Sequence, residues 1–380
     1  MVVARGVLFC GGGTGGHVLP GLAVAAALRA RGESDLRWIG DPSRIEAKLV
    51  PHAGIPLLPL GLSRPRPRDP RWLFASFCQA VGVLYELVVR PPRVVVALGG
   101  YAALLPGLIA PLVRRPLVVM EQNAHAGRTN RVLGRLARAV VTQFPEASAG
   151  LPGRRIAMLG NPVRAIPARH RGLNHELRVL VVGGSLSAKS LNDLVLAAAP
   201  ALARIPGLVV IHCAGEAEVE RARAAWSAAG VTAEVHGFIS DMPTLYERID
   251  LAVTRAGATT VAELCSAGIG ALYIPLPWAA DDHQPANARA VAAIGGAVVL
   301  PQASTSADDL AARLTTLAAD RPAITAMGAA AAALGRPRAA SDVAALVSAA
   351  GGRARGRRAR AVIRSAFRSR ITAFHHRGSP

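Results

Sequence analysis

Residues 7–17 read Val-Leu-Phe-Cys-Gly-Gly-Gly-Thr-Gly-Gly-His, an apolar run followed at once by a glycine-rich turn. The pattern predicts a buried strand, a turn and then a helix, as at the opening of a parallel α/β sheet. Glycine lets the backbone lie close to an oxyanion, and the first amides of the helix face that anion. Since His17 adds an imidazole at the same place, the stretch predicts an anion site with a titratable group beside it.

This turn has two other interpretations besides an anion site. Glycine-rich turns also occur where a helix only packs tightly against a strand. The dinucleotide-binding pattern Gly-x-Gly-x-x-Gly fits the spacing poorly, and the acidic residue that it expects about twenty positions on has only Glu33 and Asp35 as candidates. An NAD-dependent dehydrogenase is therefore the least favoured class of enzyme.

Apolar, strand-like runs alternate with segments of helical length along the whole chain. This alternation predicts parallel sheets with helices on both faces. The expected strands form two series, first 7–10, 36–40, 94–98, 117–120, 139–142 and 156–159, then 178–182, 208–212, 233–236, 251–254, 271–274 and 297–300.

The second series opens as the first does, because residues 179–185 again run from apolar residues into a glycine turn. We therefore expect an α/β protein of two doubly wound, Rossmann-like domains that face a cleft and bind ligands at the carboxyl ends of their strands. The expected parts are an N-terminal domain (1–163), a C-terminal domain (164–337), a closing helix that packs back on the N-terminal domain (338–350) and a basic, disordered tail (351–380).

The 380 residues carry a formal net charge of +20, almost all from arginine, since Lys48 and Lys189 are the only lysines. A basic chain favours anionic partners such as nucleic acid, acidic lipid or phosphorylated substrates. Nucleic acid is not expected, because aromatic residues make up only 4% and no nucleic-acid-binding signature is present. Four cysteines without paired spacing predict ordinary thiols in a reducing compartment and no metal site, and the first residues do not resemble a signal peptide.

Three stretches bear on a membrane. Residues 94–113 lack charge over the length of a spanning helix, but Gly99-Gly100 and Pro106-Gly107 favour a strand, a turn and a buried helix. The tail is either solvated or a basic amphipathic helix on an anionic membrane. Residues 64–77 suit an anionic bilayer surface, the alternative being an ordinary buried helix beside a solvated loop. Their basic and apolar side chains are Arg64, Arg66, Arg68, Arg71, Trp72, Phe74 and Phe77.

Polar clusters follow other predicted strands. Gly99-Gly100-Tyr101 and Glu121-Gln122-Asn123 come after strands of the first series and should reach the same sheet edge as His17. In the second series, residues 255–263 open a helix whose amides can bind an anion, while hydroxyls and Glu263 can hold a sugar. Asp282-His283-Gln284 open another helix, where polar residues are often only caps.

Seven motifs have the order and spacing of the MurG family, glycosyltransferases of peptidoglycan synthesis, and the chain resembles that family from about residue 5 to residue 350. The resemblance implies a GT-B fold and inverting transfer of N-acetylglucosamine from UDP-N-acetylglucosamine to the 4-hydroxyl of lipid I, giving lipid II. It implies no metal or other cofactor, a polyprenyl-diphosphate-linked acceptor, partners among cell-wall synthesis proteins, and a peripheral place on the cytoplasmic face of the plasma membrane. The motifs are GGGTGGH (11–17), GGY (99–101), EQN (121–123), GNPVR (160–164), VVGGS (181–185), RAGATTVAE (255–263) and DHQ with NA (282–288).

The resemblance also implies roles for single residues. Glu263 would hold the ribose hydroxyls, the backbone of Ile239 would read the uracil edge, and Gln284 would hold sugar hydroxyls. The positions that match donor contacts are Thr14, Gly15, Gly16, Asn123, Arg164, Ser185, Ile239, Ala258, Thr259, Thr260, Val261, Ala262, Glu263 and Gln284. The positions assigned to the acceptor are Gly13, His17, Gly99, Gly100, Tyr101, Glu121 and Gln122.

Inverting transfer needs a base on the acceptor hydroxyl and charge stabilisation on the leaving diphosphate. Without a metal, the helix that begins at Ala258 and the guanidinium of Arg164 must supply that stabilisation. His17 is the expected base, because imidazole in water titrates near neutral pH. Its alternative role is a hydrogen bond to the acceptor diphosphate.

Three departures from the family pattern bear on donor affinity and donor identity. Leu186-Ser187 replaces the usual Gln-Gly of the second glycine turn, Met120 replaces a histidine, and Cys213 stands at a common glutamine position. They leave two alternatives open: a glycosyltransferase that acts on another lipid, such as diacylglycerol, and a non-catalytic scaffold that binds nucleotide or lipid. The retained His17 and Glu263 favour an enzyme.

Overall fold

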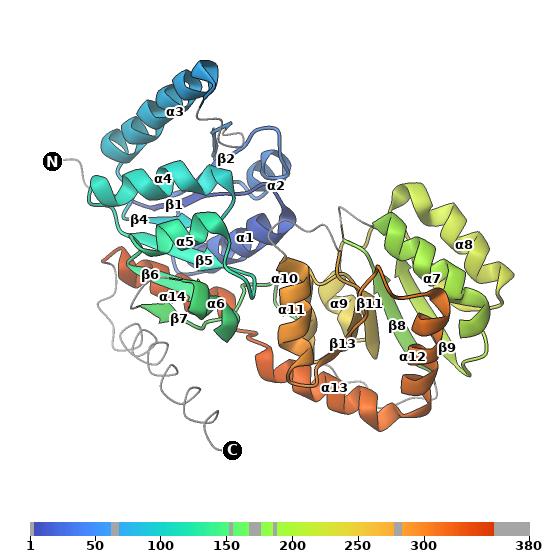
Figure 1. Ribbon diagram of the computed structural model, residues 1–380. Coiled ribbons are helices and arrows are strands. Elements are labelled where there is room, and N and C mark those ends of the chain that lie inside the picture. The colour runs from blue at the N-terminus through green and yellow to red at the C-terminus, as the bar shows by residue number, and fades with distance from the viewer. Residues whose placement is uncertain are drawn as a thin grey trace. The chain divides into compact units, whose positions relative to one another are not determined.

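The computed structural model describes residues 4–61, 68–151, 155–166, 176–184, 188–276 and 283–352. The chain forms two compact units, which are described separately. Unit 1 comprises Met1–Val163 together with Arg338–Pro380, and unit 2 comprises Arg164–Pro337 (Figure 1).

The described part of unit 1 holds a seven-stranded sheet in the order β3-β2-β1-β4-β5-β6-β7, and all neighbouring strands are parallel. The chain order changes direction between β1 and β4, so the loops after these two strands diverge at the carboxyl edge, where doubly wound folds bind ligands. The strands are β1 (Val7–Cys10), β2 (Leu36–Gly40), β3 (Leu57–Pro59), β4 (Val94–Ala97), β5 (Leu117–Glu121), β6 (Ala139–Thr142) and β7 (Ile156–Ala157).

Helices cover both faces of this sheet (Figure 1). Val7 and Phe9 of β1 belong to one core cluster, while Leu8 and Cys10 belong to the other, because successive strand residues point to opposite faces. On the first face lie α1 (Gly15–Ala30), α2 (Glu46–His52) and α14 (Ala339–Ala350). On the second face lie α3 (Pro70–Val89), α4 (Tyr101–Leu112), α5 (Arg128–Gly134) and α6 (Pro145–Gly150).

The described part of unit 2 repeats this plan with a six-stranded parallel sheet in the order β10-β9-β8-β11-β12-β13. Its order changes direction between β8 and β11, which creates a second place where loops diverge at a carboxyl edge. The strands are β8 (Leu177–Val182), β9 (Leu208–Cys213), β10 (Thr232–His236), β11 (Leu251–Thr254), β12 (Gly270–Tyr273) and β13 (Ala297–Val299).

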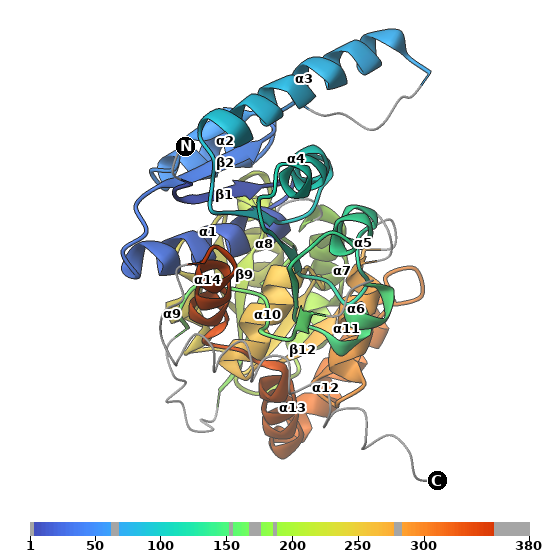
Figure 2. The same cartoon turned by 90° about the vertical axis from the view of Figure 1, so that its left-hand side faces the viewer.

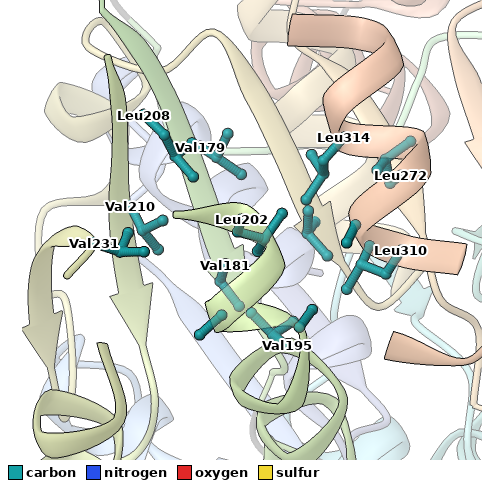
Figure 3. Packing of buried hydrophobic residues seen from close by; sticks show 14 of the residues in the cluster. Val179, Val181, Val195, Leu202, Leu208, Val210, Val231, Leu272, Leu310 and Leu314 are labelled. Carbon is teal, nitrogen blue, oxygen red and sulfur yellow. The ribbon is translucent and has the colours of Figure 1, made fainter. Parts of the chain in front are cut away.

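One apolar core of unit 2 lies between its sheet and four helices. Figure 3 shows Val181 of β8 near Val195 of α7, with Leu310 of α12 on the other side of the cluster. The helices of this unit are α7 (Ala188–Leu202), α8 (Val219–Ala228), α9 (Met242–Tyr246), α10 (Ala258–Ala267), α11 (His283–Ala292), α12 (Ala307–Ala319) and α13 (Arg321–Leu334), with a 3₁₀ turn at Glu216–Glu218.

The predicted fold class is confirmed, because both sheets are parallel and follow a doubly wound order. Each predicted strand is present within about two residues at its ends. β3 was not predicted, because the strand has only three residues and none of them is fully buried. Residues 94–113 form β4, a glycine turn and α4, as expected, rather than one continuous helix.

Unit 2 encloses a histidine in a closed hydrogen-bond network. His212 of β9 is fully buried, its Nδ1 accepts from Trp226 Nε1 at 3.1 Å, and its Nε2 lies 3.0 Å from Asn192 Oδ1. The indole N–H can only donate, so the imidazole proton lies on Nε2 and is donated to Asn192. Burial, and then the charge of Arg221, lower the pKa of His212 to about 4.

We predict that this histidine makes the protein acid-labile. The pKa of His212 is lower in the folded state than in the unfolded chain, so between about pH 6.5 and pH 4 only the unfolded chain takes up the proton, and stability falls as pH falls. The free energy of unfolding should drop by about 2 kcal/mol between pH 7.5 and pH 5 from this group. Urea unfolding at the two pH values measures the drop.

The matched control is His236→Gln, which removes an exposed imidazole from the neighbouring strand β10. This variant should retain the pH dependence, whereas His212→Gln should lose most of it. An equal drop in stability for wild type and His212→Gln would contradict the assignment.

Candidate active site

The glycine turns after β1 and β4 lie in backbone contact. A Cβ on Gly11 would stand 2.5 Å from the carbonyl oxygen of Gly99, and one on Gly100 would stand 2.7 Å from that of Gly12. All four residues have positive φ, although that of Gly12 is nearly extended. Only glycine permits this approach at both turns, so the two loops form one surface at the carboxyl edge of the first sheet.

A buried carboxylate supports the first glycine turn from beneath. Glu46 is fully buried, and its carboxylate accepts from the amide of Gly13 at 2.8 and 3.1 Å and from that of Asp41 at 3.1 Å. Trp38 Nε1 donates to the carbonyl of Gly11 at 2.9 Å. No sequence motif marks Glu46, so its role emerges only from the structure.

This support changes the expected contribution of the turn to anion binding. The amides of Gly11 and Gly13 donate within the protein, to the carbonyl of Ile39 and to Glu46. Gly13 was expected to contact the acceptor, and its amide is used within the protein. The amides of Gly15 and Gly16, which open α1 with Thr14 at the N-cap, are the candidates for anion binding.

His17 lies in the first turn of α1, half-buried, at the same edge. Its Nδ1 is 3.2 Å from the carbonyl oxygen of Gly12 and 3.3 Å from Thr14 Oγ1, and a Cβ on Gly99 would stand 3.0 Å from its Nε2. When Nδ1 donates to the carbonyl of Gly12, Nε2 keeps its lone pair beside the second glycine turn. This is the tautomer that a general base needs.

The Glu121 carboxylate is used inside its own loop. It is 3% exposed, accepts from the amide and side chain of Asn123 at 3.0 and 3.3 Å, and accepts from the amide of Gly127 and from Asn130 Nδ2 at 2.9 Å each. Glu121 was expected to contact the acceptor, and these hydrogen bonds show that its carboxylate also supports its own loop. The half-buried Asn123 is the member of this motif closest to the surface.

Gln122 and Met120 are also directed into the protein. Gln122 is 1% exposed, its NH₂ group donates to the carbonyl of Leu98 at 3.1 Å and joins the two loops, and its Oε1 has no partner among the described residues. Met120 belongs to the core cluster beneath α14, so its departure from the family pattern removes no group from this edge. Tyr101, which opens α4, is 45% exposed and remains a candidate for contact.

The second site lies in unit 2, where α10 begins at the change of strand order. No side chain caps its N-terminus, and the buried Thr259 Oγ1 has no partner among the described residues. The first amides of this ten-residue helix therefore face the carboxyl edge with the positive end of the helix dipole. Ala258, Thr259 and Thr260 thus have the chemistry of an anion site.

The residues expected at the uridine end are brought together. Arg164 Nη1 donates to the carbonyl of Ser240 at 3.1 Å, immediately after Ile239. Glu263 is 8% exposed and accepts from the Tyr246 hydroxyl at 2.8 Å. Burial raises the pKa of Glu263, while the Tyr246 hydrogen bond and the charge of Arg164 act in the opposite direction.

Arg255 anchors the loops around this second site, a role that the sequence did not reveal. It is 3% exposed and donates to the carbonyl of Ile274 at 2.8 Å and to Ser190 Oγ at 2.7 Å, which joins the ends of β12 and α7. Burial lowers the pKa of Arg255 to about 10, so it stays cationic at neutral pH. Gln284 Oε1 accepts from the amide of Leu276 at 3.0 Å. The oxygen of this carboxamide is therefore used within the protein, and its NH₂ group points away from that bond.

Cys213 lies beneath the segment that contains Ile239. Its Sγ is 3.8 Å from the carbonyl oxygen of Gly237, and burial raises the pKa of this thiol. Cys213 in place of the family's glutamine therefore changes a side chain that supports this segment. It changes no residue of the site motifs. Val261 and Ala262 are buried on α10. The expected site residues Ser185 and Asp282, the departures Leu186 and Ser187, and the arginines Arg64 and Arg66 lie outside the described residues.

Among the described residues, no three histidine, cysteine, aspartate or glutamate side chains are grouped so that they could hold a metal ion.

Comparison with known proteins identifies both units. The glycosyltransferase family 28 N-terminal domain matches residues 7–142, and the glycosyltransferase family 28 C-terminal domain matches residues 178–343. A protein of Alkalilimnicola ehrlichii is 47% identical over 89% of this chain and 97% of its own length, and one of Thiobacillus denitrificans is 42% identical over 90% and 96%. Both are named UDP-N-acetylglucosamine–N-acetylmuramyl-(pentapeptide) pyrophosphoryl-undecaprenol N-acetylglucosamine transferase.

Solved structures agree with this result. The crystal structure of Acinetobacter baumannii MurG is 34% identical, with a TM-score of 0.79 over 91% of this chain and 99% of that one. The glycosyltransferase of kitacinnamycin, at 19% identity and a TM-score of 0.66 over 92% of this chain and all of its own, shares the fold.

We predict that the first glycine turn depends on Glu46. Replacing Glu46 by Ala leaves the amides of Gly13 and Asp41 without their acceptor, which should cost about 2 to 3 kcal/mol of unfolding free energy. Glu46→Gln keeps an acceptor oxygen and should cost about half as much. Urea unfolding measures both, with the exposed Glu146→Ala of α6 as control. A loss no larger than that of the control would show that the carboxylate does not support the turn.

Proposed function

Since the chain belongs to the MurG family of glycosyltransferases, we propose that it transfers N-acetylglucosamine from UDP-N-acetylglucosamine to the 4-hydroxyl of the muramoyl sugar of lipid I, with inversion. The product is lipid II. The observation that carries the proposal is α10, whose uncapped N-terminus and buried Glu263 stand at the point where the second sheet changes strand order. Phosphate binds at such a terminus, and a carboxylate can hold sugar hydroxyls.

Unit 2 is the donor domain in this proposal. The first amides of α10, the Thr259 hydroxyl and Arg164 stabilise the diphosphate as negative charge develops on it. Glu263 holds the ribose hydroxyls, and the backbone of Ile239 reads the uracil edge. Gln284, whose oxygen is already bonded to Leu276, offers its NH₂ group to sugar hydroxyls. Protein groups supply the charge stabilisation, so we expect donor binding to persist in EDTA.

Unit 1 is the acceptor domain, and His17 is its base. Nε2 of His17 removes the proton from the 4-hydroxyl as that oxygen attacks C1 of the donor sugar and the C1–O bond to UDP breaks. The hydrogen bond between Nδ1 and the carbonyl of Gly12 orients the ring and stabilises the imidazolium that forms. The amides of Gly15 and Gly16, which the family resemblance assigns to the donor, open α1 beside this base and offer hydrogen bonds to a diphosphate.

The test is transfer of radiolabelled N-acetylglucosamine from its UDP donor to a lipid I analogue, with other UDP-sugars as competing donors and diacylglycerol as competing acceptor. We expect selective transfer to lipid I that does not require a divalent cation. Transfer to diacylglycerol would instead support the alternative lipid acceptor. Binding of UDP without any transfer would support the scaffold.

In the same assay, His17→Ala should lower kcat by about 10²- to 10⁴-fold, the usual contribution of a positioned base. Its UDP affinity should change far less than kcat, because Glu263 and Ile239, the groups proposed for the nucleoside, lie in unit 2. His52→Ala removes an exposed imidazole at the end of α2 in the same unit and serves as control. Near-normal turnover by His17→Ala would leave His17 only the diphosphate role.

We also propose that α3 binds an anionic membrane surface. Among the described helices, α3 alone is long and apolar enough to cross a membrane, yet only 17% of its apolar window is buried. Figure 2 shows the first half of α3 reaching past the rest of unit 1. Large apolar side chains recur every three or four residues on its exposed face, namely Leu73, Phe74, Phe77, Val81, Leu84, Tyr85 and Val88. Arg68 and Arg71, at its first turn, are exposed.

The second half of α3 favours a surface position over a membrane span. Val83 and Leu87 pack into a core cluster of unit 1. Glu86 is 9% exposed and forms an ion pair with Arg37, which also donates to the carbonyl of Arg90 at 2.9 Å. A span would expose this carboxylate to lipid, which is costly. We therefore propose that the protein is peripheral, on the cytoplasmic face that the family resemblance implies.

We predict that Phe74→Ser together with Phe77→Ser lowers binding to phosphatidylglycerol-containing vesicles at least about tenfold, since each buried phenylalanine contributes about 1.5 to 3 kcal/mol. Sedimentation with vesicles measures the change. Phe238→Ser, at an equally exposed phenylalanine of unit 2, should bind like wild type.

Replacing Arg64, Arg66, Arg68 and Arg71 by Gln should weaken binding to anionic vesicles only. Unchanged vesicle binding in both the phenylalanine and the arginine variants would refute the proposal that α3 binds a membrane surface.

A further inference from the structure

The uridine end of unit 2 contains a buried tyrosine that the sequence motifs do not include. Tyr246 ends the short helix α9 and is 1% exposed. Its hydroxyl donates to Glu263 Oε2 at 2.8 Å, across seventeen positions of the chain. Among the described residues, this is the hydrogen bond that the Glu263 carboxylate forms, so Oε1 is left to meet a ligand.

Glu263 needs such a partner because its carboxylate is buried, and burial disfavours the charged form of a carboxylate. It is 8% exposed, and burial raises its pKa, whereas the Tyr246 hydrogen bond and the nearby charge of Arg164 lower it. A hydroxyl that donates to a carboxylate stabilises its charged form and fixes its rotamer. A charged, oriented carboxylate accepts two sugar hydroxyls more strongly than a mobile or neutral one.

The same segment links this tyrosine to the residue that would read the base. Ile239 lies seven positions before Tyr246, and the carbonyl between them, that of Ser240, accepts from Arg164 at 3.1 Å. The segment 239–246 is therefore held by Arg164 at one end and by Glu263 at the other. This one segment therefore supports both the proposed base contact of Ile239 and the proposed ribose contact of Glu263.

We propose that Tyr246 is a positioning residue of the donor site, whose hydroxyl holds the Glu263 carboxylate in the orientation that recognises the 2′- and 3′-hydroxyls of a ribonucleotide. The inference rests on the proposed donor role of Glu263 and deepens it. Tyr246 itself touches no substrate. It acts through Glu263, so it should influence affinity only for nucleotides that carry ribose hydroxyls.

The experiment compares the affinities of the full chain for UDP and for 2′,3′-dideoxyuridine diphosphate by calorimetry. Wild type should prefer UDP by at least about tenfold, from hydrogen bonds to a charged group. Tyr246→Phe should lose most of this preference by weakening UDP while leaving the dideoxy nucleotide nearly unchanged. Glu263→Gln should lose the preference too, and the double variant should lose no more than Glu263→Gln alone.

Tyr273→Phe is the matched control, since it removes the hydroxyl of another buried tyrosine of unit 2, on β12, and should retain the wild-type preference. If Tyr246→Phe weakens both nucleotides alike, or keeps the preference that Glu263→Gln loses, Tyr246 has no positioning role and the role of Glu263 stands. If wild type itself shows no preference, the ribose role of Glu263 fails and the inference fails with it.

Discussion

The backbone contact between the glycine turns after β1 and β4 is the constraint on which the first site depends. Gly11 lies against Gly99, and Gly12 against Gly100, with no room for a Cβ at Gly11 or Gly100. This contact exists because β1 and β4 are parallel neighbours at the point where strand order changes, so both turns leave the same edge. It sets where α1 begins, and therefore where the imidazole of His17 stands. Any side chain at these turns would separate the imidazole of His17 from the second glycine turn, and so from the surface proposed for the acceptor.

The two units use one architecture for two kinds of anion recognition. In unit 1 a helix opens after a glycine turn and delivers an imidazole. In unit 2 a helix opens after β11 and delivers a carboxylate, Glu263, from its second turn. Both helices lack a side-chain cap, which leaves their first amides to a ligand. In the proposed function, this difference in the titratable group assigns proton removal to unit 1 and nucleotide recognition to unit 2.

The sequence predicted the strands well, because strands that are buried on both faces carry continuous apolar runs. It missed β3, which is short and partly exposed. The site motifs lie at the strand ends where the sequence predicted them, but the sequence could not show which of their polar groups bond within the protein. Glu121 and Gln122 were assigned to the acceptor, and the structure adds that both also bond within their loops. Glu46 and Tyr246 could not be found, since their partners lie across the fold and no local pattern marks them.

The return of the chain to unit 1 has a consequence for the order in which the protein folds during synthesis. Unit 2 is one continuous stretch, Arg164–Pro337, so all of it is synthesised before α14. The first core of unit 1 includes Val343, Leu346 and Val347 of α14, which are made after unit 2. Because domains fold as units during synthesis, unit 2 can be complete while unit 1 still exposes the apolar side chains of α1 against which α14 packs. The unit made first is thus the last to become native.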